Sequence, residues 1–233
     1  MNYNLLLSKR FTVVIQNKFM KDIIEVNVKS EIGKLNGVII HTPGEEVENM
    51  TPENAERALY SDIINLSIAR DEYKQIKGVL SKLTRTFEVK DLLCNILKDE
   101  KIKAEVLERI EKIEPFIGEQ APKGSLKEQL MEENAESLSR LLIEGVEMVK
   151  DNLTKYLSKD WFALRPMHNL LFTRDASMSV NNEVLIGRMA NAIRDRESVI
   201  MRSIFDFTPE FKTSTLTIPP IPGSANRIRT VEG

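Results

Sequence analysis

The chain has little of what several classes of protein depend on. A single cysteine, Cys94, among 233 residues excludes a disulfide framework and a cysteine-based zinc site. Two histidines, His41 and His168, are too few for a histidine-rich metal site. No run reaches the roughly 18 to 20 apolar residues that span a bilayer, and no glycine-rich phosphate loop, HExxH or GxSxG motif is present. We therefore expect no metal, no cofactor and no membrane partner.

Positive and negative charges are nearly balanced, with 33 Lys and Arg residues against 35 Asp and Glu residues and a formal net charge of −2. A nucleic-acid-binding protein shows a clear basic excess, so we expect no nucleic-acid partner. Lys9 and Arg10 interrupt the mildly apolar N-terminus and no small-residue cleavage site follows, which is not the pattern of a signal peptide. Together with the single cysteine, these features favour a cytoplasmic location.

The pattern of apolar residues divides the chain into four parts. Residues 1–21 include a second methionine, Met20, and the sequence leaves open whether they belong to the fold. Residues 22–90 and 158–233 mix strand and helix signals, whereas residues 91–157 show helical periodicity alone. We interpret residues 91–157 as a helical subdomain in an α/β chain. Helices that simply cover one sheet are the alternative.

The first mixed part predicts two strands and a helix. Residues 23–28 and 35–41 carry the β-branched residues that are typical of strands. Thr51 followed by Pro52 is a favourable helix start. The apolar spacing over residues 59–83 then predicts a long helix.

The second part predicts three helices. Residues 102–113 form one amphipathic pattern, and Ser125 with Glu128 has the spacing of a capping box. A further apolar stripe covers residues 138–149, and nothing between 91 and 157 alternates as a strand does.

The third part returns to mixed signals. Residues 177–186 predict a β-hairpin with Asn181 and Asn182 at its turn. A helix over residues 198–205 and a strand over residues 213–218 follow.

Residue types suited to binding a charged ligand gather just before this hairpin. Asn169, Phe172, Arg174 and Asp175 place an amide, an aromatic ring, a guanidinium and a carboxylate within seven residues. A desolvated carboxylate binds a guanidinium through paired, charge-assisted hydrogen bonds. The spacing is equally compatible with Arg174 and Asp175 pairing with other parts of the fold.

This segment resembles the PxxNxxFTRD motif of arginine deiminases, and other segments agree with that family in the right order. Residues 30–35 (SEIGKL) and 38–44 (VIIHTPG) resemble its opening signature, and NMTP resembles its (Arg/Asn)-Leu-Thr-Pro loop with Met50 in place of leucine. Three further segments resemble family elements, namely residues 58–63, 189–197 and 231–233. The resemblance covers residues 22–233.

The resemblance implies a fold and a reaction. The fold is an α/β-propeller of ββαβ modules around a pseudo-fivefold axis, incomplete here, with an inserted helical subdomain. The reaction is the metal-free hydrolysis of L-arginine to L-citrulline and ammonia. A cysteine thiolate attacks the guanidinium carbon and a histidine acts as acid and base. The implied partner is this small-molecule substrate, and homo-oligomerisation stays open.

The resemblance also implies roles for residues at the reacting end of the substrate. Asp175 would grip the substrate guanidinium and hold its carbon in line for attack. Phe172 would pack on the guanidinium or its alkyl stem. Glu232 would orient the catalytic histidine.

Three other residues would hold the amino-acid end of the substrate if the resemblance extends to function. Arg194 would clamp the substrate carboxylate, and Asn169 would assist it. Met50 would supply a loop contact near the substrate α-amino group.

The chain also departs from the family pattern. The family's catalytic histidine and nucleophilic cysteine follow its Val-Glu-Gly-Gly-Asp element, of which residues 231–233 match only the start. Cys94 lies in an apolar helical context, and neither His41 nor His168 matches the catalytic histidine. We therefore expect the N-terminal portion of an arginine deiminase, inactive by itself.

Other functions stay open at this point. The alternatives are a non-catalytic protein that binds guanidino compounds, a degenerate chain without activity, and another guanidine-modifying enzyme such as an amidinotransferase or an agmatine deiminase. Arg194 argues against agmatine because agmatine has no carboxylate.

Overall fold

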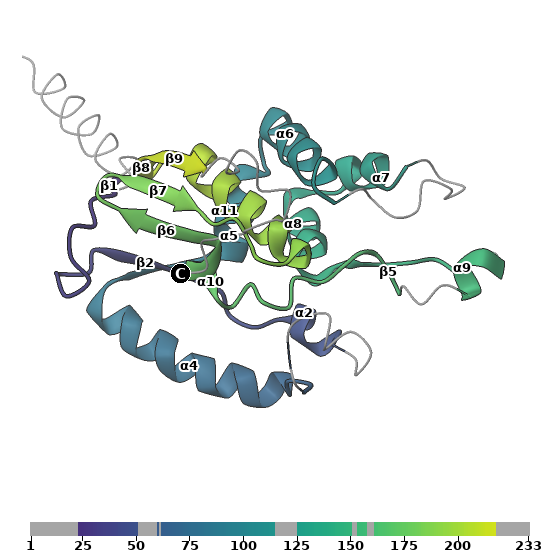
Figure 1. Ribbon diagram of the computed structural model, residues 1–233, viewed down its shortest axis with the longest axis horizontal. Coiled ribbons are helices and arrows are strands. Elements are labelled where there is room, and N and C mark those ends of the chain that lie inside the picture. The colour runs from purple at the N-terminus through teal and green to yellow at the C-terminus, as the bar shows by residue number, and fades with distance from the viewer. Residues whose placement is uncertain are drawn as a thin grey trace, which may run out of the picture.

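The computed structural model describes residues 23–50, 60, 62–114, 125–150, 153–157 and 161–217. These residues form a mixed α/β protein in which a group of helices lies beside several small sheets (Figure 1). Within them, no helix is both long enough and apolar enough to cross a membrane. The N-terminal residues 1–21, the expected helix start at Thr51 and the site residue Glu232 lie outside the described ranges.

A ββαβ unit occupies the last part of the described chain. Strands β6 (Ser177–Val180) and β7 (Glu183–Ile186) form an antiparallel hairpin, and Asn181 takes a positive φ of 54° at its turn. Helix α11 (Asp195–Phe207) follows, and β9 (Ser214–Thr217) then runs parallel to β7. The hairpin, helix and strand predicted for this region are thus confirmed, and the sheet order is β6-β7-β9.

A βαβ unit forms near the start of the described chain. Strands β2 (Gly37–Ile40) and β3 (Arg85–Glu88) are parallel neighbours, and the 18-residue helix α4 (Leu66–Leu83) connects them. The apolar spacing over residues 59–83 predicted helix before Leu66 as well, but residues 62–65 are not helical. The Asn65 side chain accepts the N–H of Ile68, which makes it the N-cap and starts the helix at the next residue.

Four helices follow β3 in sequence, and three of them carry their own start signals. Asp99, Ser125 and Asn134 each cap a helix by accepting backbone N–H groups. Ser125 and Glu128 form the reciprocal capping box that the sequence predicted. The helices are α5 (Val89–Ile96), α6 (Glu100–Glu111), α7 (Leu126–Glu132) and α8 (Ala135–Glu144).

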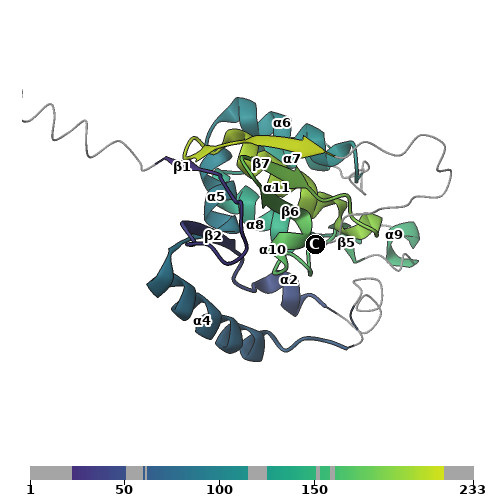
Figure 2. The same cartoon turned by 60° about the vertical axis from the view of Figure 1, so that its left-hand side comes forward.

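The main core lies where these helices meet α11 (Figure 2). Leu93 of α5, Leu107 of α6 and Leu138 of α8 are fully buried there, together with Ile204 of α11. The hydrophobic effect of this burial is the principal force that holds the helices against the ββαβ unit. The division of the chain into separate domains stays a prediction.

The third predicted helix of residues 91–157 ends earlier than its apolar stripe suggests. Helix α8 stops at Glu144 because Gly145 takes a φ of 91°, and the strand β4 (Val146–Glu147) then pairs with β5 (Phe162–Leu164). A Cβ at Gly145 would lie only 2.8 Å from the Leu164 carbonyl oxygen. The predictions of a helical stripe through residue 149 and of no strand in this part were therefore wrong.

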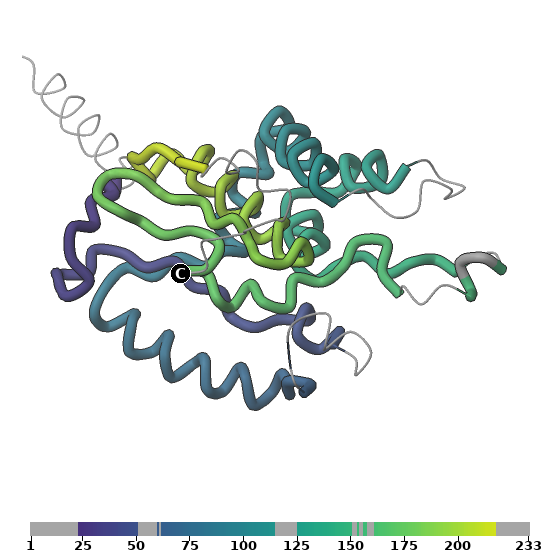
Figure 3. Tube along the Cα trace, viewed as in Figure 1, coloured from purple at the N-terminus to yellow at the C-terminus, as the bar shows by residue number. Residues whose placement is uncertain are grey.

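Short elements join the two ends of the described chain. Strand β1 (Ile24–Glu25) runs parallel to β8 (Phe211–Lys212), so segments from near the two ends of the described chain lie side by side (Figure 3). Helix α2 (Glu45–Glu48) follows β2, and α9 (Leu153–Leu157) precedes β5.

Candidate functional site

Asp175 and Arg194 contact each other. Helix α10 (Thr173–Ala176) carries Asp175, and the short 3₁₀ helix η1 (Ala192–Arg194) ends at Arg194. The Nη1 atom of Arg194 lies 2.8 Å from Oδ2 of Asp175. Arg174 instead reaches Glu31 on the surface, at 3.0 Å. The spacing left open whether Asp175 binds a ligand or pairs with another part of the fold. In the structure it forms an ion pair with Arg194, in another part of the fold.

Glu197, in the first turn of α11, holds the other side of the Arg194 guanidinium. Its carboxylate accepts from Nε of Arg194 at 3.1 and 3.2 Å and from Nη2 at 2.9 Å. The side chains of Glu197 and Arg194 are both buried, while that of Asp175 is 24% exposed. The cluster thus joins two carboxylates to one guanidinium and carries one formal negative charge in excess.

The environment of this cluster favours a charged Arg194. Burial by itself would lower the pKa of Arg194, but the hydrogen bonds and charges of Glu197 and Asp175 outweigh it and raise that pKa. Burial raises the pKa of the Glu197 carboxyl, and the Arg194 guanidinium opposes that rise. Arg194 is therefore a fixed cation with two carboxylates as its partners.

Gly187 lies directly against the backbone of Asp175. Its N–H donates to the Ala176 carbonyl oxygen at 2.9 Å, and a Cβ at this glycine would overlap the Asp175 carbonyl oxygen. A side chain at position 187 would therefore push the Asp175 backbone away from β7. The close approach of bare backbone helps to hold the carboxylate facing Arg194.

Two other predicted site residues lie in the same segment as Asp175. The Phe172 N–H donates to the Asn169 carbonyl oxygen at 2.9 Å, and the Asp175 N–H donates to the Phe172 carbonyl oxygen at 3.2 Å. Asn169 is buried, whereas Phe172 is 47% exposed. Met50 is buried after α2, with its N–H donating to the Val47 carbonyl oxygen.

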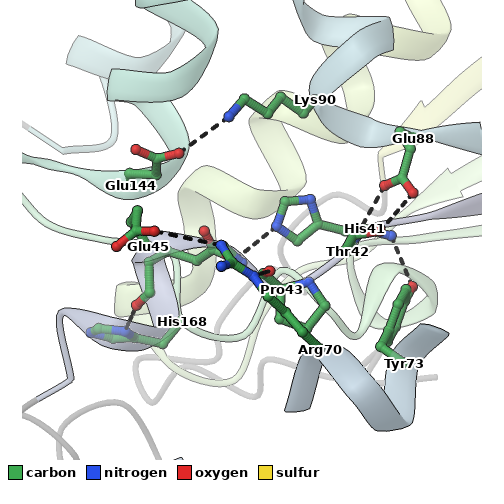
Figure 4. Close-up of polar contacts among 12 residues, drawn as sticks. His41, Thr42, Pro43, Glu45, Arg70, Tyr73, Glu88, Lys90, Glu144 and His168 are labelled. Carbon is green, nitrogen blue, oxygen red and sulfur yellow. Dashed lines mark hydrogen bonds and ion pairs between the residues drawn. The ribbon is translucent and has the colours of Figure 1, made fainter. Parts of the chain in front are cut away.

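Both histidines converge on Glu46, which sequence reasoning missed. Nε2 of His41 lies 3.0 Å from Oε1 of Glu46, and the Gly44 N–H donates to the same oxygen at 2.7 Å. Nδ1 of His168 contacts the backbone carbonyl oxygen of Glu46 (Figure 4). The Tyr60 hydroxyl donates to the His168 carbonyl oxygen at 3.2 Å. No motif marked Glu46, because the contact with His168 spans 122 residues of sequence.

This histidine network has pKa values shifted by burial and hydrogen bonding. Burial raises the pKa of Glu46, but the hydrogen bonds and charge of its neighbours, His41 first, lower it overall. Burial lowers the pKa of His168, only partly opposed by Glu46. Ionised Glu46 and neutral His168 therefore fit this site at neutral pH.

Glu88 ties the βαβ unit together beside that network. The N–H and Oγ1 of Thr42 donate to its carboxylate at 3.0 and 2.7 Å, and Nζ of Lys77 donates at 2.6 Å. The His41 N–H donates to the Tyr73 hydroxyl at 2.9 Å (Figure 4). Lys77 and Tyr73 belong to α4, so these bonds fix one side of α4 on the end of β2.

The described residues hold no cluster of three or more His, Cys, Asp or Glu side chains suited to a metal ion. Cys94 is a free, partly buried thiol on α5. It thus belongs to the helices that pack on α11 and not to the segment that carries Asp175.

Comparison with known proteins identifies the family to which this chain belongs. The family model described as arginine deiminase matches residues 56–230. The chain is 32% identical over 202 residues to an arginine deiminase of Borrelia garinii subsp. bavariensis, covering 80% of the chain and 47% of that protein. It is 35% identical over 196 residues to one of Limosilactobacillus reuteri, again covering 80% and 47%, and 32% identical over 201 residues to one of Bacillus cereus, covering 83% and 49%.

The chain therefore belongs to the arginine deiminase family. It spans about half the length of the curated relatives that it matches.

Proposed function

We propose that this chain carries the substrate-binding part of an arginine deiminase, which converts L-arginine and water to L-citrulline and ammonia. The contact between Asp175 and Arg194 is the main support. Two motif positions separated by 19 residues of sequence meet in one partly buried cluster. The excess negative charge of that cluster suits arginine, which carries one net positive charge at neutral pH.

Each end of the substrate would replace one partner of the existing ion pair. The substrate guanidinium takes the place of Arg194 at Asp175, and the substrate carboxylate takes the place of Asp175 at Arg194. Both charges of the separated pair then keep an opposite partner, which avoids the cost of leaving a buried charge unpaired. Glu197 holds Arg194 during this exchange, and the exposed part of Phe172 packs on the substrate guanidinium.

The proposed chemistry is nucleophilic. A cysteine thiolate forms a bond to the guanidinium carbon, and the bond from that carbon to one nitrogen breaks as a histidine protonates the departing ammonia. Water then attacks the same carbon, releases the thiolate and leaves citrulline. His41 and His168 are engaged with Glu46, and Cys94 lies among the packed helices. We therefore assign the nucleophile and the acid/base to the part of arginine deiminases that this chain does not cover, with Glu232 orienting the histidine.

The propeller architecture is part of the same proposal. Strands β6, β7 and β9 with helix α11 form a ββαβ unit. A propeller of this kind consists of repeats of that unit. The unit of β2, α4 and β3 is a second module with fewer strands. Both observations favour a propeller.

The binding roles predict two different kinetic defects. The measurement uses this chain joined in one polypeptide to the uncovered part of the Limosilactobacillus reuteri relative, with citrulline formation followed over a range of arginine concentrations. Asp175→Asn keeps the shape but removes the charge that pairs with guanidinium, so kcat/KM should fall about 100-fold or more. Arg194→Ala should chiefly raise KM, because it removes the partner of the substrate carboxylate.

Matched controls come from exposed residues of the same types. Asp91→Asn and Arg140→Ala alter residues on α5 and α8, outside the cluster, and should leave kcat/KM within about twofold, a difference of under half a kcal/mol. Arginine hydrolysis at the unsubstituted rate in both Asp175→Asn and Arg194→Ala would refute the assignment.

The 233-residue chain by itself should form no citrulline. It offers Asp175 and Arg194 as binding groups, but its only thiol is Cys94. The assay is citrulline release by the purified chain, with Cys94→Ala as the control. Release that disappears in Cys94→Ala would make Cys94 the nucleophile and contradict the proposed location of the site.

A further inference from the structure

Two segments that are far apart in sequence converge beside the proposed site. One, which we name the α2 segment, consists of residues 44–50 and ends at Met50. The other, which we name the Asn169 segment, consists of residues 167–172 and precedes α10. The resemblance to arginine deiminases assigns one residue of each segment, Met50 and Asn169, to the amino-acid end of the substrate. The position of one segment relative to the other would therefore set the shape of that end of the site.

Both segments rest on the C-terminal end of α8. Nδ2 of Asn49 donates to the carbonyl oxygen of Glu144 at 3.2 Å. The Met167 N–H donates to the carbonyl oxygen of the preceding residue, Ile143, at 2.9 Å. Helix α8 thus holds each segment at its own carbonyl group, but neither of these two bonds joins one segment to the other.

His168 joins the two segments directly. Nδ1 of its ring contacts the backbone carbonyl oxygen of Glu46, which lies 122 residues away in sequence (Figure 4). A carbonyl oxygen only accepts, so Nδ1 carries the proton and is the donor. The backbone of His168 is held as well, because its carbonyl oxygen accepts from the Tyr60 hydroxyl at 3.2 Å. His168 is buried, so this contact is shielded from water. The PxxNxxFTRD motif leaves position 168 unspecified, and the family roles therefore assign nothing to it.

The surroundings of the ring favour one proton over two. Burial lowers the pKa of His168, the hydrogen bond and charge of Glu46 oppose this, and the Arg196 guanidinium adds to it. Arg196 approaches from α11 and is paired with Glu114 at 3.0 Å. The Glu46 carboxylate already contacts Nε2 of His41 at 3.0 Å. A second proton on His168 is therefore unfavourable while the ring stays buried.

We propose that His168 is a positioning residue for the amino-acid end of arginine, which ties the Asn169 segment to the α2 segment through Glu46 and releases it in mild acid. The proposal rests on the proposed function, since it concerns the same substrate. A ring that has left the contact binds its second proton with an ordinary pKa of about 6.5. Each pH unit below that value then favours the released state by at most tenfold, because one proton is bound.

The first measurement is amide hydrogen exchange of the 233-residue chain at pH 7. The N–H groups of Val47 and Met50 report on the α2 segment, and those of Leu170 and Phe172 report on the Asn169 segment. His168→Ala should lower the protection factors in both segments at least tenfold, while those in α11 stay unchanged. A loss that is confined to the Asn169 segment would overturn the proposal.

The second measurement separates substrate positioning from a general loss of structure. It uses the joined polypeptide described above and follows citrulline formation at pH 7.5. His168→Ala should raise KM for arginine about tenfold and leave kcat within about twofold, because the guanidinium end at Asp175 is not changed. His168→Asn keeps an N–H donor near the place of Nδ1, so its KM should stay within about threefold of that of the unsubstituted protein.

The pH profile of KM tests the release. Asparagine does not titrate, so the KM of the unsubstituted protein divided by that of His168→Asn should rise as pH falls from 7.5 to 5.5. Comparing the two proteins at each pH cancels the titration of the groups that they share. This comparison also holds if His168→Ala fails to fold, which circular dichroism checks.

The matched control is the other histidine on Glu46. His41 contacts a residue only five positions away and does not join the two segments. His41→Gln keeps an N–H donor near the place of Nε2 but removes the titrating ring. Its KM should therefore rise in acid as that of the unsubstituted protein does.

The outcomes separate this proposal from the proposed function. An unchanged KM in a folded His168→Ala variant, an acid rise that persists in His168→Asn, or one that disappears in His41→Gln would overturn the positioning role. A joined protein that forms no citrulline even when unsubstituted would contradict the proposed function instead. Amide exchange of the chain alone would then still decide whether His168 ties the two segments.

Discussion

The two strand-helix-strand units differ in how much of their helix is covered. In both, a helix connects two parallel strands: α11 connects β7 and β9, and α4 connects β2 and β3. Helix α11 contacts α5 and α6 on one side and its own sheet on the other, and its apolar residues are buried or partly buried. Among the residues that the structure describes, helix α4 meets β3 and α2, and Leu66 is its one buried residue. Apolar residues at helical spacing therefore predict that each helix has an apolar face. They do not predict how much of that face is buried.

The largest expected difference is in the cost of removing one apolar side chain. Ile204→Ala on α11 should lower the free energy of unfolding by about 2–5 kcal/mol, because it leaves a cavity in a closed core. Ile76→Ala on α4 should change it by about 0.5 kcal/mol or less, because that side chain is already exposed. Urea unfolding of the chain alone measures both. Similar losses in the two variants would contradict the comparison.

The next largest effect should be a loss of stability around the βαβ unit at mildly acidic pH. The pKa of His168 is lowered in the folded state, so the unfolded state binds the extra proton and stability falls as pH decreases below about 6.5. The pKa of Glu46 is also lowered, so its contribution is present above about 4.5 and is lost as pH falls through the folded value. Amide protection factors around β2 and α2, which correct the exchange rate for the intrinsic rate at each pH, should therefore fall from pH 7 to pH 5 before those in α11 do. A simultaneous fall in both regions would argue against this origin.

A smaller effect is expected from the helix starts. Asn65→Ala removes the side chain that caps α4 and should cost about 1 kcal/mol. Helix α11 begins without a side-chain cap, so its start depends on packing instead. Amide exchange in the first turn of α4 is the measurement, and Asn95→Ala in α5 serves as an asparagine control. No change in α4 would mean that packing also decides where this helix begins.

Local signals predicted much of the fold where the responsible residues are close in sequence. The capping box at Ser125 and the turn at Asn181 need only a few neighbours, and both were predicted correctly. The end of α8 was predicted wrongly because an apolar stripe continued past Gly145, whereas the close approach of β5 requires the positive φ of that glycine. Such an approach is decided by tertiary packing.

The candidate site shows the same limit. The motif pointed to Asp175 and Arg194, but their mutual contact depends on how η1 packs against α10. Glu197 lay within a matched segment without an assigned role, and Glu46 had no signal at all. Their partners are set by packing and hydrogen bonding in the folded chain, which spacing alone does not specify.

The smallest effect is expected at the N-terminus, for which the sequence left two interpretations open. Deletion of residues 1–19 should change the free energy of unfolding by about 0.5 kcal/mol or less if they lie outside the fold. A thermal melt of the chain that starts at Met20 is the measurement. A loss above about 2 kcal/mol, the size of a disrupted core contact, would place these residues in the fold.

Gly187 has a consequence for transplanting the proposed guanidinium-binding element into another scaffold. The Phe-Thr-Arg-Asp tetrapeptide does not hold its aspartate by itself, because the opposite wall is bare backbone twelve positions after Asp175. A designer who grafts the tetrapeptide alone, opposite a strand with any side chain at that point, would displace the carboxylate that the graft was meant to deliver. The transferable unit is therefore the tetrapeptide together with a distant glycine, and a search for related sites gains selectivity by requiring both.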